Sequence, residues 1–158
     1  MSKTNIVRQV ISVISLNEES ALSRISSLFA ARGYNIDSLT VAAIPDSKYS
    51  RFTIVSHGDS EKLKQIILQL SKLIPVHKVF KSSELLVEKE VVLVKIPLNK
   101  ELGGLESILR SYHGEVANSG KDYLVLMAAD DSSRINEFIE SIEIFKPISV
   151  VRSGSVAI

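Results

Sequence analysis

The chain has 158 residues, of which 45% are apolar and 23% charged, a composition typical of a globular protein with one ordinary domain or two small ones. Lysine and arginine number 19 against 18 acidic residues, so the net charge of +1 provides no field that would attract nucleic acid or an acidic membrane. Cysteine is absent, which excludes disulfides and thiolate chemistry, and the N-terminal "MSKTNIVRQV" lacks the apolar run of a signal peptide or membrane span, so we expect a cytoplasmic protein.

Alternating strand and helix patterns fill the first half of the chain. The expected elements, in chain order, are a strand at 7–16, a helix at 20–32, a hairpin of strands at 35–44 and 50–58, a helix at 60–74 and a strand at 76–86. Apolar residues of the first helix fall on one face, and Gly33 follows as a residue that closes a helix in the left-handed conformation. Ser60 is a plausible cap for the second helix, and Pro75 ends it.

The second half repeats the same order. The expected elements are a strand at 90–98, a helix at 102–114 closed by Gly114, two strands within 115–130 around a turn at 119–121, a helix at 132–145 and a strand at 148–158. Each half therefore reads βαββαβ, the order of ferredoxin-like folds, in which two helices cover one face of a four-stranded antiparallel sheet. The sequence predicts an α+β protein of two tandem ferredoxin-like domains, at 1–86 and 87–158, joined within the charged "LLVEKEV".

A polar corner joins the first strand to the first helix in "VISLNEESALSRI". A strand that runs directly into a helix aims backbone N–H groups and the positive end of the helix dipole at the space above the turn, which suits a carboxylate or phosphate. Asn17 in this corner and Asn35 after the first helix each offer an amide donor and a carbonyl acceptor, which suits a zwitterionic ligand. The strand that begins at Asn35 should be an edge of its sheet, and an edge strand can pair with a copy of itself, bringing Asn35 of one subunit near Asn17 of another.

Sequence motifs of catalysis are missing. His57, His77 and His113 have no partner at metal-binding helix spacing, and no G-x-S-x-G elbow occurs. The glycines of "LGGLES" lack the spacing and the lysine of a phosphate-binding loop, and the sheet carries no set of stacking aromatics for RNA. The sequence therefore favours a protein that binds a small molecule without transforming it.

Several segments resemble one family closely. "LSRISSLFAARGYNIDSLTVA" is similar to the most distinctive segment of the small, regulatory subunit of acetolactate synthase (acetohydroxyacid synthase), and the similarity continues through "SRFTIVSHGD", "LSKLIPVHKV", "EKEVVLVKI" and "VVRSGSVA". The resemblance implies an N-terminal ACT domain for effector binding and dimerisation, a homodimer, and a separate catalytic large subunit. It also implies that this chain performs no chemistry and that thiamine diphosphate, FAD and Mg belong to the catalytic partner.

The resemblance further implies that valine is the allosteric effector and that it binds between two ACT domains. On one side it would be held by the strand-to-helix corner and on the other by the strand after "RGYN". Carried onto this chain, the effector-binding residues are Asn17, Ser20, Ala21, Leu22, Asn35 and Ile36. Ser20 stands where the family usually has glycine, so its side chain could crowd the ligand, cap the helix in its place, or turn outward without effect.

Two other classes of protein stay open on the sequence. An amino-acid-sensing ACT protein that regulates a different enzyme or a transcription factor would keep the corner and the dimer, although no helix-turn-helix segment is present. A small phosphatase of the same fold would need an arginine in its anion loop, where "SLNEES" has two acidic residues instead.

Overall fold

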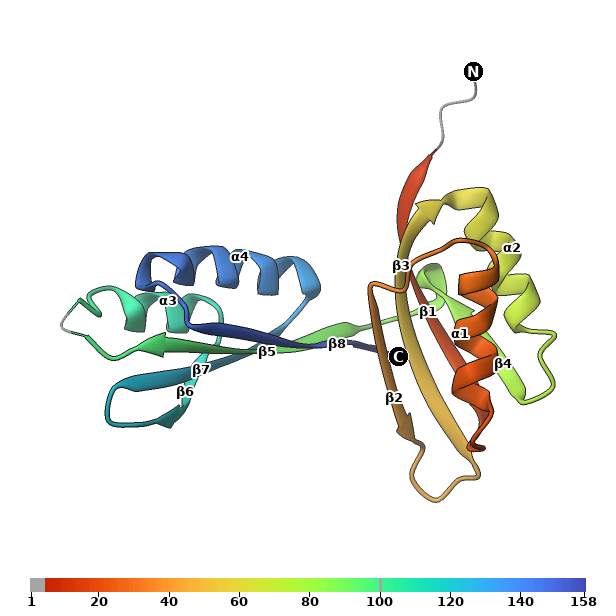
Figure 1. Ribbon diagram of the computed structural model, residues 1–158, viewed down its shortest axis with the longest axis horizontal. Coiled ribbons are helices and arrows are strands. Elements are labelled where there is room, and N and C mark those ends of the chain that lie inside the picture. The colour runs from red at the N-terminus through yellow and green to blue at the C-terminus, as the bar shows by residue number, and fades with distance from the viewer. Residues whose placement is uncertain (1–4, 100) are drawn as a thin grey trace. The chain divides into compact units, whose positions relative to one another are not determined.

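The computed structural model of the protein describes residues 5–99 and 101–158. The chain divides into two compact units, the first formed by the residues up to Val87 together with Ser155–Ile158 and the second by Glu88–Gly154 (Figure 1). These units differ from the expected ranges 1–86 and 87–158 chiefly in the return of Ser155–Ile158 to the first unit. In the part of the chain just defined, no helix combines the length and the apolar character needed to cross a bilayer.

The first unit has the expected βαββαβ order. Its elements are β1 (Ile6–Leu16), α1 (Ala21–Ala31), β2 (Ser38–Ala43), β3 (Tyr49–Asp59), α2 (Ser60–Leu70), β4 (Val76–Lys81) and the short 3₁₀ turn η1 (Ser82–Glu84). The strands form an antiparallel sheet in the order β2-β3-β1-β4, and both helices cover the same face of it (Figure 1). The edge position of β2 is the one that the sequence predicts.

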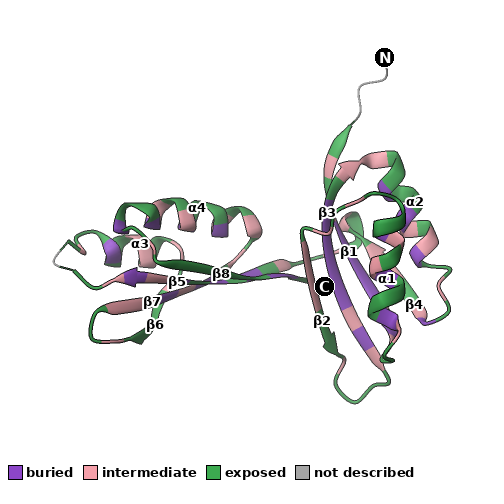
Figure 2. Cartoon of the chain, in the orientation of Figure 1, coloured by how far each residue is buried: buried purple, intermediate pink, exposed green. Residues whose placement is uncertain are grey.

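Alternation along the central strands builds the core of this unit. Buried side chains of β1 and β3 that point toward the helices meet the apolar stripes of α1 and α2, which is why the central strands are mostly buried in Figure 2. The fully enclosed members are Ile11, Val13, Ile25, Phe29, Ile54, Leu63, Ile66 and Leu70. The apolar faces of the helices and the inward-facing residues of the strands therefore form one layer between the sheet and the helices. The hydrophobic periodicity of the sequence is thus sufficient to account for this arrangement.

The opposite face of the first sheet is covered in part by the end of the chain. Val10 and Val55 pair across β1 and β3, and Ala157 packs against both together with Leu85. Nη1 of Arg51 donates to the carbonyl of Ala157 at 3.3 Å. The C-terminal residues are therefore part of the first unit's packing.

Local details of the helix ends differ from the sequence predictions. Gly33 adopts the expected left-handed conformation, with φ +67°. The second helix is capped by Asp59, whose side chain accepts from the N–H groups of Glu61 and Lys62, and not by Ser60. It ends at Leu70 instead of residue 74, because single turns replace the helix before Pro75, whose ring disfavours a helical residue ahead of it.

The second unit repeats the architecture. Its elements are β5 (Glu88–Pro97), α3 (Leu105–Ser111), β6 (Glu115–Ser119), β7 (Tyr123–Asp130), α4 (Ser132–Ile142), the 3₁₀ turn η2 (Glu143–Phe145) and β8 (Ser149–Ala157), whose last residues belong to the first unit. The sheet order is β6-β7-β5-β8, and α3 and α4 cover one face (Figure 1). The fold class predicted from the sequence, two ferredoxin-like domains in tandem, is confirmed. His113, with φ +52°, takes the left-handed position after α3 that was expected of Gly114.

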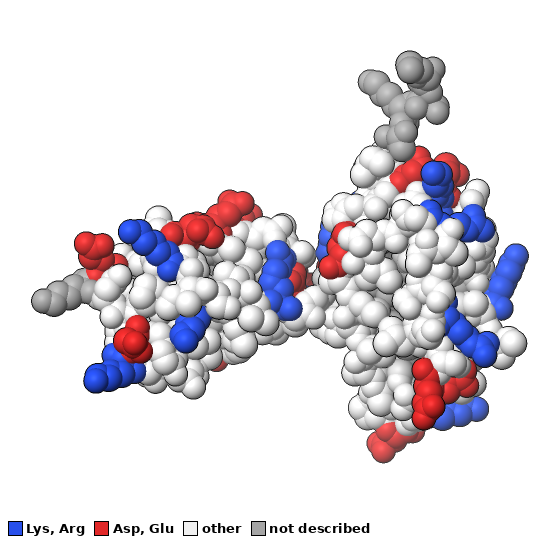
Figure 3. Space-filling model, in the orientation of Figure 1, with Lys and Arg blue, Asp and Glu red and all other residues white. Residues whose placement is uncertain are grey.

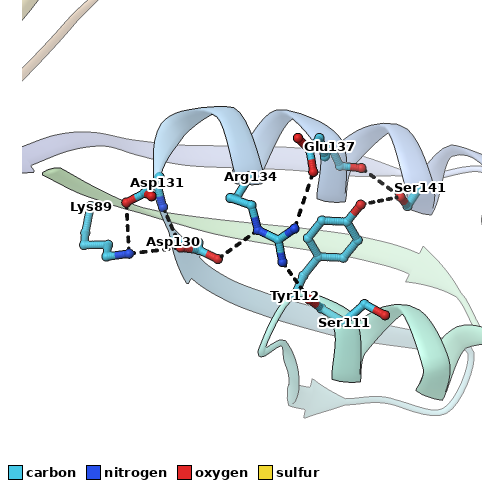
Figure 4. A network of polar contacts seen from close by, with 8 residues as sticks. All are labelled: Lys89, Ser111, Tyr112, Asp130, Asp131, Arg134, Glu137 and Ser141. Carbon is cyan, nitrogen blue, oxygen red and sulfur yellow. Dashed lines mark hydrogen bonds and ion pairs between the residues drawn. The ribbon is translucent and has the colours of Figure 1, made fainter.

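A polar network ties β5, β7, α3 and α4 of this unit together (Figure 4). Nζ of Lys89 lies 3.0 Å from Oδ1 of Asp130 and 2.9 Å from Oδ1 of Asp131. Arg134 donates to Asp130 and lies over the ring of Tyr112, 4.7 Å from its centroid. The pKa of Asp130 is lowered to about 2, mainly by the hydrogen bond from Lys89 and next by that from the N–H of Asp131. This carboxylate therefore stays charged, and keeps its contacts with Lys89 and Arg134, down to strongly acidic pH.

Candidate functional site

The corner after β1 is held by backbone hydrogen bonds from two other parts of the first unit. The N–H of Leu16 donates to the carbonyl of Pro75 at 2.8 Å, and the N–H of Asn17 donates to the carbonyl of Lys48 at 3.0 Å. The N–H of Glu18 donates to the carbonyl of Leu16 at 3.0 Å. The backbone of the corner is thus held by two loops, Leu16 by one and Asn17 by the other, while Asn17 itself is exposed.

The start of α1 leaves donors available above the corner. The first intrahelical hydrogen bond runs from Arg24 to the carbonyl of Ser20 at 3.0 Å, so the N–H groups of Leu22 and Ser23 precede it and have no partner within the helix. Ala21 is buried, and its N–H donates to Glu18. The side chain of Leu22 is 43% exposed beside these donors. The corner therefore combines N–H groups that have no partner within the helix with one exposed apolar side chain.

Ser20 precedes α1 in an ordinary helical conformation, with φ −85° and ψ −11°. Its side chain makes no capping hydrogen bond, and its hydroxyl donates to Oε1 of Glu18 at 3.1 Å on the exposed side. Of the three roles open to this serine, the geometry supports the one in which the side chain turns away from the helix N–H groups. No glycine is needed here for backbone reasons, because φ is negative.

The second predicted half of the site, Asn35 and Ile36, lies between α1 and β2. Asn35 is exposed, and Ile36 is half-buried against the core. Nδ2 of Asn35 donates to Oδ1 of Asp37 at 3.3 Å, and Oδ2 of Asp37 lies 2.6 Å from Nδ1 of His57. The sequence did not indicate this link to His57, since it joins residues far apart in the chain that no local pattern relates.

Within one chain the two halves of the predicted site are far apart. Asn17 follows the end of β1, at the level where Leu16 pairs with Tyr49. Asn35 lies before Ser38, which is level with Val55 and Val10 near the other end of the sheet. At about 3.4 Å per residue the two positions are separated along the strands by on the order of 20 Å. The residues predicted to bind the effector therefore form two separate groups, referred to below as half-sites of the predicted site, in a single chain.

The surface around these half-sites carries mixed charge. On the face shown in Figure 3, lysine and arginine alternate with acidic side chains over both units without a broad field of one sign. Among residues 5–99 and 101–158, no group of three or more histidine or acidic side chains is arranged to hold a metal ion. At the two half-sites, the groups available for binding are backbone N–H donors, the amides of Asn17 and Asn35, and the apolar side chain of Leu22.

Known protein families match both units. A family model described as the small subunit of acetolactate synthase matches residues 89–158. A second model, described as the ACT domain of proteins like the AHAS small subunit, matches residues 11–78. The two matches follow one another along the chain, one in each unit.

Similar proteins cover nearly the whole chain. The acetolactate synthase isozyme 3 small subunit of Escherichia coli K12 is 37% identical, with 96% of this chain and 95% of that protein covered. A probable acetolactate synthase small subunit of Archaeoglobus fulgidus is 30% identical, with 96% of each covered. The crystal structure of the acetolactate synthase small subunit from Thermotoga maritima superimposes with a TM-score of 0.84 at 25% identity, again over 96% of each chain.

Proposed function

Because the chain belongs to the family of acetolactate synthase small subunits, we propose that it is a non-catalytic regulatory chain that activates a catalytic acetolactate synthase subunit and makes it sensitive to valine. The observation that carries the proposal is the similarity along nearly the full length to proteins that bear this name. Thiamine diphosphate, FAD and magnesium belong, in this proposal, to the catalytic chain.

A two-fold dimer through β2 would complete the effector site. Antiparallel pairing of two β2 edges brings the start of one β2 beside the end of the other. The end of β2 at Ala43 is level with Ser50 and Ser15, close to Asn17. Asn35 of a second copy would therefore reach the end of the sheet at which Asn17 lies, which is the reason for proposing a homodimer.

The chemistry of the two half-sites suits an amino acid with an apolar side chain. The N–H groups of Leu22 and Ser23 can hold the carboxylate at the positive end of α1. The side-chain carbonyls of Asn17 and Asn35 can accept from the ammonium group. The exposed face of Leu22 can cover an aliphatic side chain, as valine requires.

Reconstitution tests the proposal directly. The chain alone should not convert pyruvate to acetolactate, and its addition should raise the turnover of the cognate catalytic subunit. Addition of valine should then reduce the turnover of the complex and leave that of the isolated catalytic subunit nearly unchanged. Turnover by the isolated chain, or a catalytic subunit that does not respond to it, would contradict the proposal.

Replacement of Ser20 by glycine should leave valine inhibition unchanged. The hydroxyl is directed to Glu18 and the backbone conformation is ordinary, so glycine removes no obstacle at the helix N–H groups. The substitution should lower the free energy of unfolding by about 0.5–1 kcal/mol, because glycine increases the entropy of the unfolded chain. Valine titration of the complex, with thermal unfolding in parallel, measures both effects. A tenfold decrease in the half-inhibiting valine concentration would show that the serine crowds the ligand.

A further inference from the structure

The end of β3 makes three successive contacts with the segment that carries Asn35. We infer that Ser56, His57 and Gly58 are positioning residues that hold Asn35 in the conformation in which it meets the effector. The link to the effector rests on the function proposed above, whereas the positioning itself can be measured on the free protein.

The segment before β2 needs such support because the sheet does not hold it. The ladder between β2 and β3 begins at Ser38, and the last backbone bond before it runs from the N–H of Asp37 to the carbonyl of Val55 at 2.8 Å. Asn35 and Ile36 precede this bond, and side-chain contacts must therefore fix them.

The ring of Tyr34 packs directly against the backbone of Gly58. A Cβ placed on Gly58 would lie 2.0 Å from Cε1 and 2.7 Å from Cδ1 of that ring, so only glycine allows the ring to lie where it does. The φ angle of Gly58 is not positive, so the requirement comes from the ring and not from the backbone. Tyr34 immediately precedes Asn35, so the packing of its ring on β3 fixes the position from which the chain continues into Asn35.

Ser56 fixes the backbone of Asn35. Its hydroxyl, on a fully buried side chain, donates to the carbonyl of Asn35 at 2.7 Å. This bond resists displacement, because separating the two groups leaves the buried hydroxyl of Ser56 without a partner.

His57 orients the side chain of Asn35 through Asp37. Nδ1 of His57 contacts Oδ2 of Asp37 at 2.6 Å, and Oδ1 of Asp37 accepts from Nδ2 of Asn35 at 3.3 Å. With its amide nitrogen engaged, Asn35 presents its carbonyl oxygen as the group for a ligand donor. One residue of β3 thus fixes the ring of Tyr34, a second fixes the backbone of Asn35, and a third fixes the side chain of Asn35.

Two variants test the inference, each with a matched control. Ser56→Ala removes the hydroxyl, and Ser12→Ala, the control, removes an equally buried hydroxyl from β1 that has no hydrogen-bond partner among the described residues. Gly58→Ala displaces the ring of Tyr34, and Gly120→Ala produces the same conflict with Tyr123 in the second unit, at 2.2 Å from Cε1. The measurements are amide hydrogen exchange of residues 34–37 in the free protein and the half-inhibiting valine concentration of the reconstituted complex.

We expect Ser56→Ala and Gly58→Ala to accelerate exchange in residues 34–37 and to raise the half-inhibiting valine concentration, each by about threefold to tenfold, with activation at zero valine retained. Both controls should leave these two quantities unchanged. Gly58→Ala should have no further effect in a Tyr34→Ala background, because the ring that it displaces is gone.

Unchanged exchange in both variants would overturn the positioning. Faster exchange with an unchanged valine response would overturn the link between this segment and the effector. If valine fails to inhibit the wild-type complex, the proposed function fails, and faster exchange in the two variants would still support the positioning.

Discussion

A complex that carries Asn35→Ala is expected to need at least about tenfold more valine for half-inhibition than the wild-type complex. In the proposed dimer the side-chain carbonyl of Asn35 pairs with the ammonium group of valine, and the loss of one buried hydrogen bond to a charged group amounts to about 1.5–3 kcal/mol. Each 1.4 kcal/mol corresponds to about a tenfold change in the concentration required. Asn17→Ala should act in the same direction, because it contributes from the other half-site.

Neither substitution should disturb the fold. Both asparagine side chains are exposed, and the backbone of Asn17 is held through its N–H group. Asn118→Ala, at an exposed position on the edge strand β6, is the matched control and should leave the valine titration unchanged. Wild-type inhibition curves in both Asn17→Ala and Asn35→Ala would place the effector site elsewhere on the chain.

Arg152→Ala is expected to lower the free energy of unfolding of the second unit by about 3 kcal/mol. Glu90 on β5 is 4% exposed, and Arg152 on β8 reaches it with two donors, of which Nη2 lies 2.9 Å from Oε2. The same guanidinium donates from Nη1 to Asn136 of α4 at 2.8 Å. Alanine at this position leaves a buried carboxylate without its cation, which costs more than the pair itself contributes.

Denaturant unfolding, followed through the hydrogen exchange of α4 amides, would measure this loss in the second unit alone. Arg110→Ala is the control, because its pair with Glu106 has side chains 80% and 86% exposed and should contribute less than about 0.5 kcal/mol. The double variant Glu90→Leu with Arg152→Leu should recover most of the stability, since no buried charge remains. Equal losses for Arg110→Ala and Arg152→Ala would contradict the argument.

Much of the fold could be predicted from the sequence because local patterns carry it. The stripe of α1 that includes Ile25 and Phe29 and the alternation of Ile11 and Val13 on β1 identify element types and the faces that they bury. The repeat of the same order in both halves gave the tandem architecture, and the strings around "RGYNIDSLTV" gave the family, which the relatives confirm. The effector-binding role of Asn17, Ser20, Ala21, Leu22, Asn35 and Ile36 stays a prediction.

Tertiary structure decided what depends on residues distant in the chain. The sequence alone determined that β2 is an edge strand, that a helix spans about residues 20–32, and that Asn17 and Asn35 are polar residues at element ends. Only the fold revealed that Ser56, His57 and Gly58 hold the segment of Asn35, and that Ala157 packs on Val10. Helix and strand periodicities record which face a residue occupies within its own element, whereas such contacts depend on the strand register and on the path of the chain between elements, which no local period encodes.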